Sequence, residues 1–340
     1  MGQGRRLPVG KLPTELLGRL LERYRLEDDR VVLGARIGED AAVLDMGETY
    51  LVAKTDPITF ATDQIGWYAV HVNANDLVTT GATPLWFLAT VLLPERANDE
   101  AMVEKIFRQM HQACADLGIS LVGGHTEITY ALDRPIVVGQ MLGEVEKEKL
   151  VTTSGARVGD AILLTKGVAI EGTAVIAREK EAQLRERGYA PDFIARAQRY
   201  LFEPGISVFR EARLASQAFN VHAMHDPTEG GLAMALYELA EAAGVGLLIE
   251  EGKIEVLPEC RQLCAEFGLV PLGTIASGAL LITLPSAQAE ELEAVLSAEH
   301  IPASVIGHVQ SAESGVKLRR GISTIDMPRF PQDEIAKLFG

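Results

Sequence analysis

Four oxygen-bearing side chains lie at the ends of short apolar segments in the first quarter of the chain. Asp40 falls in a glycine-bearing turn, Thr55 and Asp56 follow the strand-like run 50–54, and Asp76 lies in a helical segment with an otherwise apolar face. A carboxylate on such a face must be paired or bound to a metal, because burying it bare is costly. Hard oxygen ligands suit Mg²⁺ that bridges nucleotide phosphates. The set predicts a metal–phosphate site, although each residue taken singly is better explained as an ordinary turn or surface residue.

A second group of polar residues follows a strand-like segment and has the sequence Gly123-Gly124-His125-Thr126-Glu127. Paired glycines after a strand let the backbone approach a ligand closely. His125 is a candidate phosphate donor or proton carrier, and a merely oriented loop residue is the alternative.

Two further segments have glycines close to a predicted helix start. In 224–231, backbone N–H groups can hold an anion, and Asp226 or Thr228 can equally be the helix cap. The segment 166–173 contains two glycines but lacks the lysine that follows the second glycine of a phosphate loop. It predicts a strand-to-helix turn.

The elements that must position these groups form a mixed first half. Alternating apolar and polar residues predict strands near 41–44, 50–54, 85–93, 120–123 and 136–145. Two helices, over about 64–80 and 98–117, are followed by Gly81 and Gly118, and glycine is the expected helix stop. An amphipathic helix with Thr14 as its cap precedes them.

The second half has an α+β pattern. Strands are predicted over 161–165, 245–250 and 279–284, and helices over 172–178, 191–200, 232–243 and 287–299. The charged run 144–149 marks the domain boundary, with a hairpin turn inside one domain as the alternative. The predicted division is an arm and helix (1–34), two domains (35–149 and 150–317) and a tail (318–340).

Composition limits the classes of function. A chain of 340 residues with 47% hydrophobic and 23% charged residues can build two domains with large cores. The 32 basic and 47 acidic residues give a net charge of −15, which argues against a nucleic-acid partner. No signal peptide and no apolar run of about 18 residues is present, so a soluble cytoplasmic protein without a membrane partner is expected. Cys114, Cys260 and Cys264 are expected to be free thiols, because a zinc site needs about four ligands.

Taken in order, these segments resemble the aminoimidazole ribonucleotide synthetase superfamily, from about Arg36 to about Lys317. Its members include the purine-pathway cyclase, thiamine-monophosphate kinase, selenophosphate synthetase and a hydrogenase-maturation protein. The segments similar to the family's signatures are Gly38–Val43, Thr55–Asp56, Asn75–Pro84 and His225–Ala233. The last of these is most similar to the hydrogenase-maturation branch.

The resemblance implies a two-domain α/β protomer with a mixed N-terminal sheet and a C-terminal α+β sandwich. It implies a homodimer in which the N-terminal sheets of two protomers close a barrel, with ATP lying between the domains. It also implies a set of residues for Mg²⁺-ATP. The expected metal ligands are Asp40, Asp56, Asp76 and Asp226; the expected nucleotide contacts are Asp40, Thr55, Asp56, Asn75, Asp76, Gly123, Gly124 and Thr126; the expected catalytic residues are Asp56, His125 and Asp226.

Two departures from the family bear on the reaction. The hydrogenase-maturation protein carries its substrate on a C-terminal cysteine, whereas the last cysteine here is Cys264. That protein and thiamine-monophosphate kinase have an acidic residue where His125 stands. Selenophosphate synthetase shares the histidine, but its reactive N-terminal segment is absent here.

The sequence therefore predicts an ATP- and Mg²⁺-dependent enzyme that transfers the γ-phosphoryl group to an oxygen or other heteroatom of a small or carrier-borne substrate. A thiamine-monophosphate-type kinase and a non-catalytic ATP-binding partner in a maturation complex are the alternatives.

Overall fold

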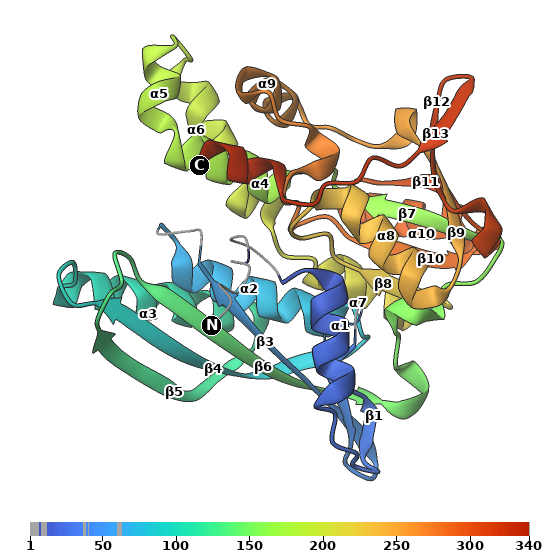
Figure 1. Ribbon diagram of the computed structural model, residues 1–340, viewed down its shortest axis with the longest axis horizontal. Helices are drawn as coiled ribbons and strands as arrows, with labels where there is room; N and C mark the ends of the chain where they lie inside the picture. The colour runs from blue at the N-terminus through green and yellow to red at the C-terminus, as the bar shows by residue number, and fades with distance from the viewer. Residues whose placement is uncertain (1–6, 8–11, 37–38, 40, 60–62, 340) are drawn as a thin grey trace, which may run out of the picture.

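The computed structural model describes residues 7, 12–36, 39, 41–59 and 63–339. Two β-sheets, one in each half of the chain, lie with helices between and around them (Figure 1). The predicted two-domain α/β fold class is confirmed.

The first half is a six-stranded mixed sheet in the order β1-β2-β3-β6-β4-β5. Only the β4–β5 pair is parallel among the strand pairs of this sheet in the described chain. Its strands are β1 (Val31–Leu33), β2 (Ala42–Asp45), β3 (Thr49–Ile58), β4 (Thr83–Pro94), β5 (Ser120–Thr129) and β6 (Ile136–Glu146). Helices α2 (Ile65–Val78) and α3 (Glu100–Leu117) cover one face of the sheet, and Figure 1 shows the other face without a helix over it.

Helix α2 is the central element of the molecule. All of its residues except Trp67 are buried, because the sheet lies on one side of it and the second half of the chain on the other (Figure 1). Gly66 permits close packing on α3, since a Cβ there would lie 2.5 Å from the carbonyl oxygen of Ile106. A helix that is buried all round is typical of such an enclosed position.

The second half is a seven-stranded sheet in the order β13-β12-β9-β11-β7-β10-β8. Its strands are β7 (Asp160–Thr165), β8 (Ala223–His225), β9 (Gly246–Glu250), β10 (Leu281–Pro285), β11 (Ala303–Gln310), β12 (Val316–Arg320) and β13 (Ser323–Asp326). Its helices are α4 (Ile170–Glu179), α5 (Glu181–Glu186), α6 (Pro191–Arg199), α7 (Phe209–Ala218), α8 (Gly231–Ala243), α9 (Pro258–Phe267) and α10 (Ala289–Ala298).

One hydrophobic cluster runs through both halves. It joins residues of α2, α3 and the first sheet to residues of α4, α6 and α9, and it includes Ile335 near the C-terminus. The two halves therefore share a core rather than meeting only across a polar surface.

Three sequence-based details differ from the structure. β3 continues through Asp56 and Pro57 and does not end before them. Only β6 pairs with this part of the strand, because β2 pairs no further than Ala53, so the proline nitrogen has no partner strand on the β2 side to which it would need to donate. β5 continues through 123–126, so these residues form a strand and not a loop after one. Helix α1 (Thr14–Arg23) has Pro13 in the capping position, so Thr14 is its first residue and not its cap.

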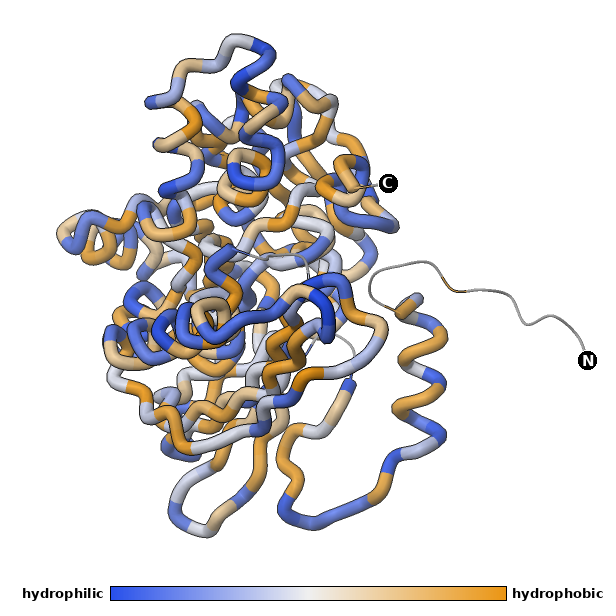
Figure 2. Tube along the Cα trace, turned by 90° about the vertical axis from the view of Figure 1, so that its left-hand side faces the viewer, coloured by the Kyte–Doolittle hydropathy of each residue, from blue (hydrophilic) through white to orange (hydrophobic). Residues whose placement is uncertain are grey.

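Figure 2 shows α1 standing beside the body of the molecule. Among the described residues, no helix is both long and apolar enough to cross a membrane. The prediction for the cysteines is confirmed, since Cys114, Cys260 and Cys264 are all free and buried.

Candidate active site between the two halves

The ammonium group of Lys54 joins two of the predicted carboxylates. Lys54 and Asp56 lie two residues apart on β3, so strand alternation turns both toward the face that α2 covers. The Lys54 Nζ lies 3.0 Å from Asp76 Oδ2 and 3.6 Å from Asp56 Oδ2. Only 3% of the Asp76 side chain is exposed, against 37% of Asp56. The structure thus brings Asp56 and Asp76 together around one cationic group, buried at the α2 end and open at the β3 end.

Thr55 does not join these carboxylates through its side chain. It lies between Lys54 and Asp56 on the opposite face of β3, and its hydroxyl donates to the carbonyl oxygen of Gly139 at 2.9 Å. Asp40, the remaining N-terminal ligand expected from the sequence, lies outside the described residues.

The segment 123–126 lies away from the carboxylates within one protomer. In the sheet register, Asp56 pairs with Gly139, Gly139 with Ala89, and Ala89 with Gly124. Three strand spacings of roughly 4.8 Å place Gly124 about 14 Å from Asp56. A Cβ on Gly124 would lie 2.0 Å from the carbonyl oxygen of Ala89, so this strand pair requires a glycine there.

His125 lies on the uncovered face of the sheet. Its Nε2 is 3.2 Å from Glu127 Oε2, and 67% of its side chain is exposed. A single protomer therefore does not bring His125 to Asp56 and Asp76.

The loop before α8 carries the second-half candidates. Asp226 is 1% exposed, and the neighbouring His225 has its Nε2 3.0 Å from Glu238 Oε2 on α8. Gly230 occupies the capping position with φ +82°, so the capping residue is neither Asp226 nor Thr228. The prediction of Asp226 or Thr228 as the cap is wrong. A carboxylate from the far end of the chain, Asp333, accepts the Gly230 N–H instead.

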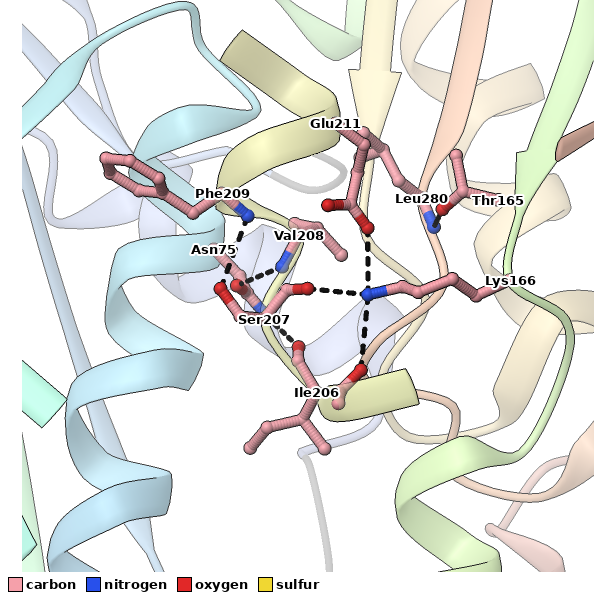
Figure 3. Close-up of polar contacts among 10 residues, drawn as sticks. Asn75, Thr165, Lys166, Ile206, Ser207, Val208, Phe209, Glu211 and Leu280 are labelled. Carbon is pink, nitrogen blue, oxygen red and sulfur yellow. Dashed lines mark hydrogen bonds and ion pairs between the residues drawn. The ribbon is translucent and has the colours of Figure 1, made fainter. Parts of the chain in front are cut away.

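A buried lysine organises the segment that faces α2 from the second half (Figure 3). Lys166 follows β7, confirming a strand-to-helix turn there, and its Nζ lies 2.8 Å from Glu211 Oε1. The same ammonium donates to the carbonyl oxygens of Gly205 at 3.2 Å and Ser207 at 2.6 Å. Because both charged side chains are at most 5% exposed, this ion pair and its carbonyl bonds fix the turn at 205–208.

Asn75 connects that turn to α2 (Figure 3). Its Nδ2 donates to the Ile206 carbonyl at 2.8 Å, and its Oδ1 accepts the Val208 N–H at 2.9 Å. Both ends of the amide thus bond to the backbone of the other half. Asn75 lies one residue from Asp76, so it also sets the position of α2 beneath the carboxylates.

Further buried polar groups lie where α2 meets α4. Burial raises the pKa of Glu171 to about 8, and it lowers the pKa of His71 to about 3, so both are mainly neutral near pH 7. Among the described atoms, the two ring nitrogens of His71 have no hydrogen-bond partner. The same holds for Oε2 of Glu171. His71 packs on Trp67 at a ring-centroid distance of 4.2 Å. His71 and Glu171 are therefore buried polar groups that carry little charge near neutral pH, beside the ion pair of Arg178 with Asp63.

Sequence reasoning missed Lys54, Lys166 and Glu171. The signal for Lys54 was present, because it alternates with Asp56 along a strand. Lys166 and Glu171 carried no comparable signal, since their burial depends on contacts with distant segments.

Comparison with known proteins identifies the family. The model of the AIR synthase related protein N-terminal domain matches residues 38–145, and that of the C-terminal domain matches residues 157–318. Together they cover most of the chain.

Individual relatives agree with this match. A Methanocaldococcus jannaschii protein provisionally named for hydrogenase expression and formation is 27% identical over 94% of each chain. The carbamoyl dehydratase HypE of Cupriavidus necator is 30% identical over 77% of this chain and 73% of its own. A solved structure of the hydrogenase maturation protein HypE in complex with ATP superposes with a TM-score of 0.72 at 27% identity, covering 87% of this chain and 89% of that one. The chain belongs to the AIR synthase related proteins, in their HypE-like branch.

Proposed function

We propose that the protein is an ATP- and Mg²⁺-dependent enzyme that transfers the γ-phosphoryl group of ATP to an oxygen or other heteroatom of a small or carrier-borne substrate. The observation that carries the proposal is the convergence of Asp56 and Asp76 on the Lys54 ammonium. The ATP complex of the related HypE structure supports the choice of nucleotide.

The residues present fit a hydrated magnesium ion. Asp56 and Asp76 already share one cation, so a cation position exists at their carboxylates. No group of three or more His, Cys, Asp or Glu side chains suited to a metal was found in the part of the chain that the structure describes. Mg²⁺ commonly uses one or two carboxylates and completes its shell with water and substrate phosphates, so Asp56 and Asp76 alone would be enough to hold it. Asp40 and Asp226 remain proposed additional ligands.

The chain's own residues have separable tasks in this proposal. Mg²⁺-ATP supplies the phosphoryl group and neutralises the charge that develops during its transfer. Asp56 and Asp76 would hold the metal from β3 and α2, and the Lys54 ammonium holds the same carboxylates in this structure. Burial of Asp76 keeps water from one side of the site and strengthens its interaction with a cation. Asn75 fixes α2 to the turn at 205–208 and so holds the neighbouring Asp76 in a constant position.

The test is the replacement of each carboxylate by its amide. Asp56→Asn and Asp76→Asn are expected to weaken Mg²⁺-ATP binding by at least roughly 10-fold, the loss typical of perturbed metal sites, and to abolish ATP hydrolysis. Asp326→Asn is the matched control, because Asp326 pairs with Lys317 in a surface hairpin of the second sheet. Calorimetric titration and phosphate release measure the two effects.

The same measurements separate the alternatives. Unchanged binding and hydrolysis in both variants would show that the site is wrongly assigned. Tight ATP binding by the unaltered protein without phosphate release would favour a non-catalytic partner. Phosphate transfer to thiamine monophosphate would favour that kinase.

We further propose that the enzyme is a homodimer through its first sheet. The face without a helix over it carries half-buried apolar side chains of β4 and β6, among them Leu88, Leu92, Val138 and Leu142. Strand β5 is the outermost strand of this sheet in the part of the chain that the structure describes. An exposed apolar patch and an open strand edge are typical of a protein–protein contact, and a second copy is the occupant implied by the family.

A further inference from the structure

The C-terminal strap, residues 327–339, is packed onto the second half. In Figure 1 it runs from β13 across that half toward α4 and α6. The Met327 carbonyl accepts the Tyr237 hydroxyl at 2.6 Å, and the Leu338 carbonyl accepts the Lys180 ammonium at 2.7 Å. The ring of Phe330 packs so closely on Gly273 that a Cβ there would lie 2.4 Å from it. The strap is held along its whole length.

One carboxylate of the strap joins three separate backbone groups. Asp333 Oδ2 accepts the Gly230 N–H at 2.6 Å, while Oδ1 accepts the N–H groups of Ile275 at 3.2 Å and Ile335 at 2.9 Å. Gly230 belongs to the loop that carries Asp226, and Ile275 belongs to the neighbouring turn. Asp333 thereby connects the loop to that turn and to the strap.

The contact lies at the start of α8, where the capping residue has no side chain of its own. Gly230 occupies that position, so the carboxylate that reaches its backbone comes from the strap. Gly230 and Gly231 both have positive φ, and a Cβ on Gly231 would lie 2.6 Å from the Leu272 carbonyl oxygen. The loop must therefore lie directly against the 270–275 turn, and an ionised acceptor bridging the two strengthens that approach.

The position of Asp333 is electrostatically unfavourable, which argues against a passive surface cap. Its pKa is raised to about 6, chiefly by burial and less strongly by Glu229, although the three N–H donors act to lower it. Glu171 also faces this carboxylate. An acid placed beside two others, and away from solvent, costs stability that a neutral capping residue in the loop would not.

We propose that Asp333 is a positioning residue that fixes the 226–231 loop, and with it Asp226, toward the Mg²⁺-ATP site. The expected effect of Asp333 on catalysis rests on the proposed function. Its contact with the loop does not. The strap is thus part of the catalytic domain, although it lies beyond the residues 157–318 matched by the family.

The test compares two neighbouring carboxylates of the strap. Asp333→Ala removes the bridge and Asp333→Asn weakens it, whereas Glu334→Gln alters the acceptor of the Val270 N–H at 3.0 Å and leaves Gly230 untouched. Amide hydrogen exchange of the peptide covering 226–234 is measured without nucleotide. Hydrolysis is then measured as kcat and KM for ATP and as a function of Mg²⁺ concentration.

Asp333→Ala is expected to speed exchange at 229–231 by about 10-fold or more. It should lower kcat by a similar factor, raise the Mg²⁺ requirement and leave KM for ATP nearly unchanged. Asp333→Asn, which keeps one carbonyl acceptor, should give a smaller change in the same direction and serves if the alanine variant fails to fold. Glu334→Gln should alter exchange only near Val270.

Unchanged exchange at 229–231 in both Asp333 variants would overturn the inference. Equal effects of Glu334→Gln on the loop and on kcat would overturn it too, because strap docking in general would then be responsible. If the unaltered protein binds no Mg²⁺-ATP, the proposed function fails, while the exchange comparison still decides whether Asp333 holds the loop.

Discussion

At the level of single residues, Glu171 shows how burial sets chemistry at the junction of the halves. It is 8% exposed, with its pKa raised to about 8 by burial and, less strongly, by Glu229 and Asp333 on the elements facing it. Ser277 hydrogen bonds oppose the shift. Near neutral pH it is mainly a carboxylic acid, able to donate a proton in a hydrogen bond.

This shift predicts how stability depends on pH. The pKa of Glu171 in the folded protein lies above its ordinary value of 4.5, so its favourable contribution is complete below about pH 4.5 and is lost as the pH rises through 8. Up to about 5 kcal/mol of the free energy of unfolding is at stake. As the pH is raised from about 5 to about 8.5, the free energy of unfolding should therefore fall less in the Glu171→Gln variant than in the unaltered protein. Urea unfolding at each pH measures this difference.

A surface glutamate provides the comparison for that experiment. Glu250→Gln removes a partly exposed ion pair with Arg319 and should leave the pH dependence close to that of the unaltered protein. The same pH dependence in both variants would contradict the assignment to Glu171.

At the level of elements, the attachment of α2 to the turn at 205–208 predicts a large effect from a small change. Asn75→Ala removes both hydrogen bonds and leaves the Ile206 carbonyl and the Val208 N–H buried without those partners. A loss of about 2 to 4 kcal/mol in the free energy of unfolding is expected, measured by urea unfolding.

Asn73 is the matched control on the same helix. Its amide donates to the Ala69 carbonyl one turn away at 2.8 Å and to the Asp56 carbonyl on β3 at 3.4 Å, so Asn73→Ala breaks contacts inside the first half and not those that Asn75 makes between the halves. It should be less destabilising. Equal losses would argue that Asn75 has no special role between the halves.

The elements also show what the sequence could predict. Periodicity and glycine stops predicted α2, α3, α8 and most strands, because these signals are local. The signature aspartates 56 and 76 were found because their carboxylates stand out against apolar neighbours. The extension of β5 through Gly124 was not predicted, since it depends on the close approach of β4. The Asp333 cap lies 103 residues from Gly230, and no local pattern reports such a contact.

At the level of the whole molecule, the uncovered face of the first sheet predicts the oligomeric state. Light scattering after size exclusion should give about twice the 36.7 kDa chain mass. Leu142→Asp places a charge on that face and should yield a monomer, because a buried unpaired charge is costly.

The exposed Ile322, in the turn between β12 and β13, offers the control for this change. Ile322→Asp should leave the mass unchanged, since that residue is fully exposed and lies on the second sheet. A monomeric unaltered protein, or a Leu142→Asp variant that stays dimeric, would refute contact through this face.

The hydrophobic cluster that crosses from α2 and α3 into α4, α6 and α9 has a mechanical consequence. The predicted division at residues 149 and 150 stays a prediction, but a cut there would not yield two self-sufficient fragments, because each would expose apolar surface that the other now covers. Hinge bending of one half against the other would expose the same apolar surface to water. We therefore expect substrates to enter and leave by the movement of loops, while the two halves keep their relative position.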